Sequence, residues 1–183
     1  MIGISGRGYG SAATFLTQVS SEDRTAQSTV PKVELQVPAG EITKRLGVEP
    51  EAQVISRHQE RSIDGIPWSL QTSYYPWGFI TMGATDLLMA QDIKPGTVDY
   101  LAKKVGVRQI GYRDWITARL PDENEQKFFG IAHDTTVFVI FRTAFDQNKS
   151  PMRLTVTVFP ADRNQFIVNT GDDLPDPQYD ETP

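Results

Sequence analysis

The sequence predicts an α+β protein whose main body is an antiparallel β-sheet with short helices in the connections. Stretches with the alternation or β-branched composition of strands outnumber the helical ones. Two pairs of these stretches are joined by short turns, as in β-hairpins, and each helical stretch is short and lies between strands. With 183 residues, of which 39% are hydrophobic and 22% charged, the chain is typical of a globular protein with one core.

Residues 1–30 are expected to form a connector, because they are rich in Gly, Ser and Thr and residues 20–29 have the composition of a linker. Residues 33–37 alternate as a short strand does. Residues 40–46 follow as a short helix that Gly47 can end in the left-handed conformation.

A β-hairpin is predicted over residues 54–76, with its turn at Asp64-Gly65, because this dipeptide favours a type I′ turn. If these two residues form the loop, Ile63 faces Ile66 and Arg61 faces Trp68, and the pairing continues outward. One face then carries Ile55, Arg57, Gln59, Leu70, Thr72 and Tyr74. The opposite face is polar and is expected to lie toward water.

Arg57, Gln59 and Arg61 therefore point to the apolar side of this hairpin. Burying a guanidinium without compensation costs several kcal/mol or more, so the two arginines require an anionic partner or a wet cavity. The alternative is that this face lies at the sheet edge, where the arginines reach solvent and Arg61 stacks on Trp68.

The segment after the hairpin is apolar and irregular, with a partial helix expected over residues 85–91. A regular helix is predicted over residues 98–105, with Thr97 as its N-cap and Gly106 at its end.

Residues 108–120 read as a long strand with Asp114 on an otherwise apolar face. Two interpretations of Asp114 remain open. In the structural interpretation, Asp114 sits at a bulge or pairs with a core arginine such as Arg142. In the functional interpretation, it accepts hydrogen bonds from a ligand.

The last third of the chain predicts a capped helix and a second hairpin. Asp122 and Glu125 have the spacing of a capping box. Strands are expected over residues 136–145 and 152–159. A short strand over 166–168 follows, and residues 171–183 have the composition of a flexible acidic tail.

Several chemical classes are excluded or disfavoured. The chain has no cysteine, which excludes disulfides and thiolate catalysis, and its net charge of −5 without a basic run argues against nucleic-acid binding by this chain itself. No signal peptide or run of ~20 apolar residues is present, so a cytoplasmic location is expected. His58 and His133 show no spacing of metal ligands, and neither a metal nor a cofactor is expected.

Six motifs occur in a defined order: R-x-x-x-R-x-x-D-G-x-P, T-S-Y-Y-P, K-V-G-V, D-x-I-x-A-R-x-P-x-x-x-E, V-F-V-I-F-R-T and P-A-D-R-N-x-F. Together they resemble the UTRA domain, the effector-binding domain of HutC-type GntR transcription regulators and a relative in fold of chorismate lyase. The resemblance runs from about Val37 to Val168.

The resemblance implies a six-stranded, mainly antiparallel sheet with flanking helices, a homodimer, and a pocket for a small-molecule effector. In this family the pocket controls operator binding by an N-terminal winged helix-turn-helix, often in a repressor. Residues 31–170 would be the UTRA domain, and G-R-G-Y-G within residues 1–30 resembles the remnant of a wing. The chain is therefore expected to be part of a longer regulator that contacts DNA only through that missing domain, and a free-standing UTRA protein is the alternative.

The family often holds an anionic group with two arginines on the first hairpin strand. Gln59 occupies one of these positions and Asn164 stands where many members carry tyrosine, so an anionic effector is favoured but phosphate in particular is not. The predicted ligand-binding set is Arg57, Gln59, Arg61, Trp68, Thr72, Tyr74, Asp114 and Asn164. No catalytic residue is expected, although a chorismate lyase-like enzyme and a dimerisation module with a vestigial pocket are the alternatives.

Overall fold

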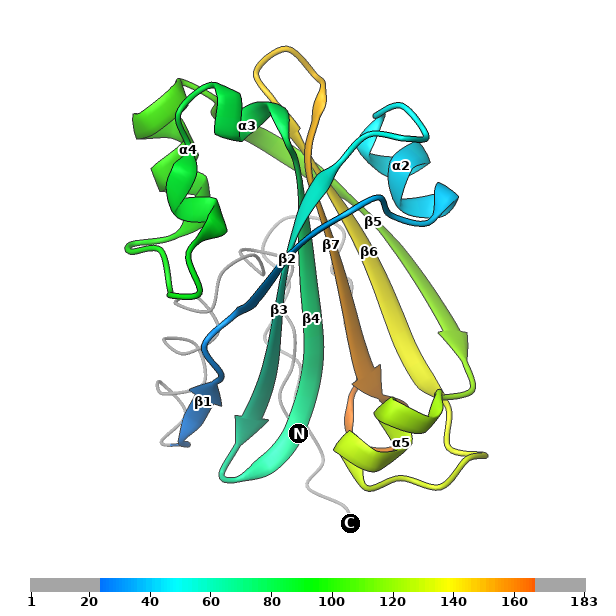
Figure 1. The fold of residues 1–183 in the computed structure, drawn as a ribbon. Coiled ribbons are helices and arrows are strands. Elements are labelled where there is room, and N and C mark those ends of the chain that lie inside the picture. The colour runs from blue at the N-terminus through cyan, green and yellow to red at the C-terminus, as the bar shows by residue number, and fades with distance from the viewer. Residues whose placement is uncertain (1–23, 167–183) are drawn as a thin grey trace, which may run out of the picture.

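A computed structural model describes residues 24–166, in which an antiparallel sheet of seven strands forms the body of the protein (Figure 1). The strand order is β1-β3-β4-β7-β6-β5, with β2 also paired to β3. The strands are β1 (Ala26–Ser28), β2 (Lys32–Gln36), β3 (Val54–Ile63), β4 (Ile66–Pro76), β5 (Gln109–Arg119), β6 (Val137–Asp146) and β7 (Pro151–Pro160).

The predicted α+β class is confirmed, and the sheet has seven strands where six were expected. β1 and β2 share one edge of β3, so the sheet is six positions wide. β1 lies in a segment whose composition predicts a linker, yet Ala26 pairs with Ile63 and Ser28 with Arg61. The hairpin tip holds this segment, because the Asp64 carboxylate accepts hydrogen bonds from Thr25 N and Arg24 Nε, each at 2.8 Å.

The β3–β4 hairpin turns at Asp64 and Gly65, both with positive φ (53° and 78°), as the sequence predicts. The predicted register is confirmed for Ile63 with Ile66 and Ser62 with Pro67 and is wrong beyond these two pairs. Ser62 faces Pro67 but Arg61 faces Ser69, so Trp68 is an extra residue in a β-bulge.

This one-residue shift moves the side chains of β4 to the opposite face, because side chains alternate along a strand. Leu70, Thr72 and Tyr74 lie on the face opposite to Arg57, Gln59 and Arg61. The residues that do share the face of these three side chains are Ser69, Gln71 and Ser73, which the unbulged register places toward water.

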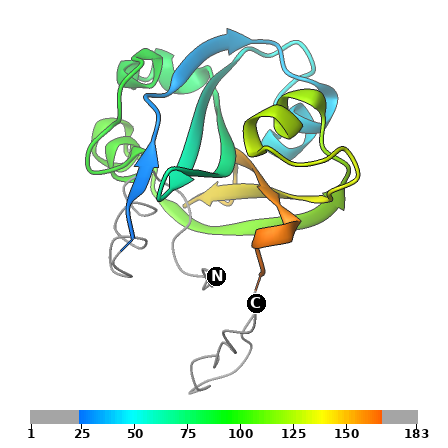
Figure 2. The ribbon, with the colours of Figure 1, turned by 90° about the horizontal axis from the view of Figure 1, so that it is seen from below.

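Helices cover both faces of the sheet (Figures 1 and 2). On one face lie α2 (Gly40–Leu46) and α5 (Glu123–Phe129); on the other lie α3 (Gly78–Thr81), the 3-10 helix η1 (Thr85–Leu88) and α4 (Thr97–Val105). We call these the α2/α5 face and the α4 face. A further 3-10 helix, η2 (Ala161–Arg163), follows β7.

The core is correspondingly divided between the two faces. On the α2/α5 face, Leu46, Val54 and Leu154 pack together, as do Phe129, Val137, Val139 and Val158. On the α4 face, one end of the sheet packs against the helices through Ile55, Tyr75, Phe79, Leu87 and Leu101. At the other end, Ile63, Trp68 and Phe159 form a separate cluster.

The helices agree with the sequence except in the segment after β4. That segment forms α3, which the sequence does not predict, and η1 in place of the partial helix over 85–91. The helix at 97–105 has no side-chain cap, so Thr97 does not act as its N-cap. The capping box is confirmed, with the Asp122 carboxylate accepting from Glu125 N at 2.8 Å and the Glu125 carboxylate from Asp122 N at 2.9 Å.

Phe166 forms a single β-bridge. The other residues of the strand expected over 166–168, the acidic tail and the wing-like glycine motif lie outside the described residues. No helix in the described part of the chain is both long and apolar enough to cross a lipid bilayer.

Candidate functional site

Five polar residues, one from each of five neighbouring strands, face one another across the α4 face. In order they are Arg57 on β3, Ser73 on β4, Thr155 on β7, Arg142 on β6 and Asp114 on β5. Ser73 Oγ and Thr155 Oγ1 are 3.0 Å apart and hydrogen-bonded. All but Asp114 are buried. We call this set the polar row.

A second line of polar side chains runs beside the polar row. Gln59 faces Gln71, which faces Thr157, and one step further Arg61 faces Ser69. Arg61, Ser69 and Gln71 are buried, and the Ser69 hydroxyl has no hydrogen-bond partner among the described residues. A buried hydroxyl without a partner is unusual in a folded protein, so the Ser69 hydroxyl is available for a hydrogen bond to a ligand.

The polar row and its neighbours lie between the two apolar clusters of the α4 face. Ile55, Tyr75 and Ala144 border them on the side of the helices, and Ile63, Trp68 and Phe159 border them on the other. Burying polar side chains costs free energy relative to apolar ones of similar size. We call the polar row and the second line of polar side chains together the polar band. Its burial is not explained by folding alone, and we take it as the candidate site.

Arg57 is held by three backbone carbonyl oxygens of the segment after η1. Its Nη1 donates to Leu87 O and Met89 O, both at 2.8 Å, and its Nη2 donates to Gln91 O at 2.6 Å. Burial lowers the pKa of Arg57, while the charge of Asp92 and the Tyr75 hydroxyl act in the opposite direction. The carbonyls satisfy the guanidinium but do not neutralise its charge.

Gln59 ties the same segment to the beginning of the sheet. Its Nε2 donates to Asp92 Oδ1 at 3.1 Å, to Ser28 Oγ at 3.1 Å and to Thr29 O at 2.9 Å. Arg57 and Gln59 thus connect β3 with the segment at 87–92. Gln59 also connects that segment with β1.

Asp114 is paired with Arg142, which is the structural interpretation left open by the sequence. Arg142 Nε donates to Asp114 Oδ1 at 2.7 Å and Nη2 to Oδ2 at 2.6 Å, a bidentate pair. The Arg142 guanidinium also lies 3.9 Å from the centre of the Tyr112 ring.

Three residues of the predicted set lie elsewhere. Thr72 is on the α2/α5 face, where its Oγ1 is 2.9 Å from His58 Nδ1. Tyr74 packs there beside the cluster of Leu46, and burial raises the pKa of its phenol. Asn164 follows η2, and its amide donates to Pro160 O at 2.8 Å.

The structure gathers Arg57, Gln59, Arg61, Trp68 and Asp114 on the α4 face, with Trp68 in the bordering cluster. The sequence reasoning named Arg142 only as a structural partner of Asp114. The other polar residues of this face, which it did not assign to the site, are Ser69, Gln71, Ser73, Arg153, Thr155 and Thr157. The alternation of Thr155 and Thr157 with valines in a buried strand was the available signal. The residues on β4 could not be assigned to this face from the sequence, because the bulge at Trp68 reverses the faces of the side chains that follow it.

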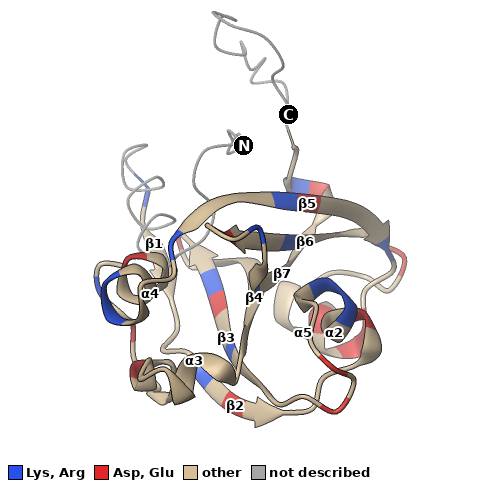
Figure 3. Ribbon diagram, turned by 90° about the horizontal axis from the view of Figure 1, so that it is seen from above, with Lys and Arg blue, Asp and Glu red and all other residues tan. Residues whose placement is uncertain are grey.

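Positive charge dominates this face. By strand register Arg57, Arg61, Arg142 and Arg153 lie on it, together with the Asp114 carboxylate at the end of the polar row. Figure 3 marks the positions of the charged residues along the ribbon. Arg153 also donates through Nη2 to Gln109 Oε1 at 3.2 Å. A chain with a net charge of −5 therefore concentrates arginines on one buried face.

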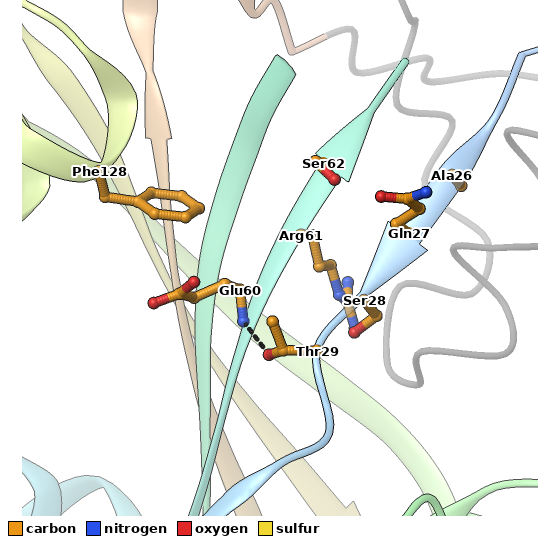
Figure 4. Close-up of a pocket in the computed structure, with 8 residues that line it drawn as sticks. All are labelled: Ala26, Gln27, Ser28, Thr29, Glu60, Arg61, Ser62 and Phe128. Carbon is orange, nitrogen blue, oxygen red and sulfur yellow. Dashed lines mark hydrogen bonds between the residues drawn. The ribbon is translucent and has the colours of Figure 1, made fainter. Parts of the chain in front are cut away.

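An open hollow of about 450 Å³ lies at the corner of the sheet, where β1 meets the end of β3 (Figure 4). Glu60 extends toward Phe128 of α5, while Arg61 extends toward Ser28 on β1. Glu60 N donates to Thr29 Oγ1 at 3.0 Å across its floor. Side chains from both faces of the sheet line the hollow, and Arg61 is shared between the hollow and the polar band.

Comparison with known proteins agrees with this architecture. The family model of the UTRA domain matches residues 21–165, while no curated protein matches the chain. The effector domain of PhnF from Mycobacterium smegmatis superposes with a TM-score of 0.73 at 19% identity, covering 93% of this chain and 99% of that one. A putative GntR-family transcriptional regulator superposes with a TM-score of 0.77 at 22% identity, covering 93% and 69%.

The C-terminal domain of YurK from Bacillus subtilis superposes with a TM-score of 0.69 at 19% identity, covering 78% of this chain and 96% of that one. At these identities the superpositions establish the fold, and the family match extends over most of the chain. The chain belongs to the UTRA domain family.

Proposed function

We propose that this chain is the effector-sensing domain of a GntR-type transcription regulator, and that the effector binds at the polar band of the α4 face. The observation that carries the proposal is the row of polar side chains, drawn from five strands, buried except for Asp114 and bordered by apolar clusters on both sides. Ligand sites are usually concave and apolar with a few convergent polar groups. The effector domain of PhnF, with which the chain superposes, supports the same conclusion.

The effector is a small molecule with an anionic group. Four arginines share the face. The Asp114 carboxylate is paired with Arg142 and that of Asp92 accepts from Gln59, while the guanidinium of Arg57 is held by neutral carbonyls. Away from bulk water, an anion and an arginine attract each other more strongly than in solution. Ser69, Gln71 and Thr157 supply hydroxyl and amide groups that can orient the rest of the ligand.

Effector binding would act on operator binding by an N-terminal winged helix-turn-helix, as in HutC-type regulators. An effector shifts such an equilibrium only to the extent that it binds one arrangement more tightly than the other. Arg57 and Gln59 belong to the polar band and also hydrogen-bond the segments at 87–92 and 28–29. We propose that these two residues transmit effector binding to β1.

The proposal is tested by thermal unfolding with a panel of phosphorylated sugars, carboxylic acids and amino acids. A ligand at 100 times its dissociation constant stabilises the folded state by about 2.7 kcal/mol. We expect an anionic member of the panel to raise the Tm, and we expect Arg61→Ala and Gln71→Leu to abolish that rise.

Arg45→Ala is the matched control, because Arg45 packs over Phe141 on the α2/α5 face. It should lower the starting Tm and leave the ligand-induced rise intact. A rise retained in Arg61→Ala and Gln71→Leu would contradict the site, and turnover of the stabilising ligand would favour an enzyme.

A further inference from the structure

Part of the α4 face is exposed to solvent among the described residues. Helices α3 and α4 lie toward the β3 side of this face, and the middle of β5 lies away from them (Figures 1 and 3). There, Tyr112 and Ile116 flank Asp114 on the α4 face and are 37% and 48% exposed. On β6, Phe138 and Ile140 are only partly buried. We call these five residues the open surface, and it adjoins the polar band at Asp114.

The last described residue, Phe166, lies at the border of the open surface. Its ring packs edge-on against Phe138 and Phe159, with ring centres 5.1 and 5.6 Å apart. Phe138 belongs to the open surface and Phe159 to the cluster that borders the polar band. The residues that follow Phe166 in the sequence therefore start beside both.

The segment after Phe166 is strongly acidic. Residues 167–183 contain no lysine or arginine and have five carboxylates, Asp172, Asp173, Asp176, Asp180 and Glu181. This equals the net charge of −5 of the whole chain. The α4 face carries the opposite charge, in Arg57, Arg61, Arg142 and Arg153. Residues 1–23 have one arginine and two carboxylates, so charge complementarity selects the C-terminal segment as the occupant of this face.

The acidic segment is also long enough to reach the polar band. Asp172 is six residues beyond Phe166, and an extended chain advances about 3.3 Å per residue, so it reaches about 20 Å. Along β6, Phe138 and Arg142 are four residues apart, which is about 13 Å. Asp172 and Asp173 can therefore reach the polar row without displacing Phe166.

We propose that the acidic tail, residues 171–183, binds along the open surface of its own chain, with Asp172 and Asp173 at the arginines of the polar band. Leu174 and Tyr179 supply apolar side chains for the open surface. A tethered segment has an effective concentration in the millimolar range, so weak contacts are sufficient to hold it.

The tail then acts as a built-in competitor of the effector, a role that rests on the proposed function. Its carboxylates contact the arginines that an anionic effector requires, so the effector binds only to the fraction of molecules whose tail is released. The apparent dissociation constant rises in inverse proportion to that fraction.

The position of the tail is tested by paramagnetic relaxation in NMR spectra of the full chain without effector. The chain has no cysteine, so Gln178→Cys accepts a single spin label. We expect the label to broaden the backbone amides of residues 112–116 and 138–142 and to spare those of residues 32–36 at the opposite edge. Replacing the four aspartates of the tail with Asn and Glu181 with Gln gives a neutral-tail chain, in which the broadening should be lost.

A mixture separates binding within one chain from binding between two copies. Spin-labelled chain without isotope is mixed with ¹⁵N-labelled chain that carries no spin label. The amides of the ¹⁵N-labelled chain should keep their intensity, because each tail binds its own chain. Broadening in the mixture would overturn the proposal in favour of a tail from a second copy.

A fluorescein-labelled peptide of residues 169–183 gives a second readout by fluorescence anisotropy. The full-length neutral-tail chain should bind the peptide at least tenfold more tightly than the wild type, whose own tail competes. In the neutral-tail chain, Arg61→Gln should weaken peptide binding at least fivefold, and Arg153→Gln replaces it if that variant does not fold. Arg45→Gln on the α2/α5 face is the matched control and should leave the affinity unchanged.

Equal peptide affinity in the wild type and the neutral-tail chain, or broadening that persists in the neutral-tail chain, overturns the proposal. Neither measurement uses an effector. If both succeed and the panel of phosphorylated sugars, carboxylic acids and amino acids stabilises neither chain, the proposed function fails while the tail contact stands. A panel member that raises the Tm equally in both chains would overturn the competition.

Discussion

Single residues on the α4 face show how one side chain can serve both folding and a site. Asp114 neutralises Arg142 in a bidentate pair, with 25% of the Asp114 side chain and 10% of the Arg142 side chain exposed. The pair closes the β5 end of the polar row. Its first role is thus to make a buried arginine tolerable, and any contact with a ligand is added to that.

Asp114→Ala should lower the free energy of unfolding by about 1–3 kcal/mol, because Arg142 loses its carboxylate while remaining largely buried. Chemical denaturation measures the change. Adding Arg142→Met should recover part of the loss, since the charge is then removed as well. The exposed pair of Lys32 and Glu34 is the control, and Glu34→Ala should give no measurable change.

His58 predicts a pH dependence of stability. Desolvation lowers the pKa of its half-buried imidazole below the ordinary value of 6.5, with Glu60 acting in the opposite direction. The unfolded state then binds a proton more readily than the folded state, so stability is full above pH 6.5 and falls as the pH drops through the folded-state pKa.

His58→Gln should flatten the decline in Tm below pH 6.5, measured by calorimetry at several pH values. His133→Gln is the control, because His133 is exposed in a turn and should leave the profile unchanged. An unaltered profile in His58→Gln would exclude His58 as its source.

At the scale of elements, the bulge at Trp68 determines which side chains meet. The Asp64-Gly65 turn is readable from the sequence because only certain residues accept positive φ at both positions. A bulge has no such signature here, since Trp68 and Ser69 are ordinary strand residues. The hairpin could therefore be predicted from the sequence and the face of its second strand could not.

The contact of Arg57 with the segment after η1 is the clearest link between elements. Arg57→Ala removes three hydrogen bonds to Leu87, Met89 and Gln91 and should raise amide hydrogen exchange across residues 85–92 by about tenfold or more. Mass spectrometry of peptic fragments measures this. Lys94→Ala, an exposed change nearby, should leave exchange as in the wild type, and unchanged exchange in Arg57→Ala would contradict the link.

At the scale of the whole molecule, the sequence predicts the fold well because each main strand carries its own local signal. β5, β6 and β7 and the helices at 40–46 and 123–129 are recognisable from alternation, β-branched residues or caps. The polar row joins residues from 57 to 155, and its assembly depends on register across four strand pairs. No local pattern encodes that register, which is why Arg57 and Asp114 were predicted and Ser73 and Thr155 were not.

The positions of the tryptophans also give the molecule built-in optical probes. Trp68 is 7% exposed in the cluster that borders the polar band, and Trp115 is 57% exposed at the middle of β5. An indole in water emits at longer wavelength than one in apolar surroundings and is more accessible to a soluble quencher. Quenching by iodide should thus select Trp115. Trp77 is partly buried beside the cluster of Phe79, so in the Trp77→Phe variant the protected emission reports on Trp68 alone and effector binding can be followed in unlabelled protein.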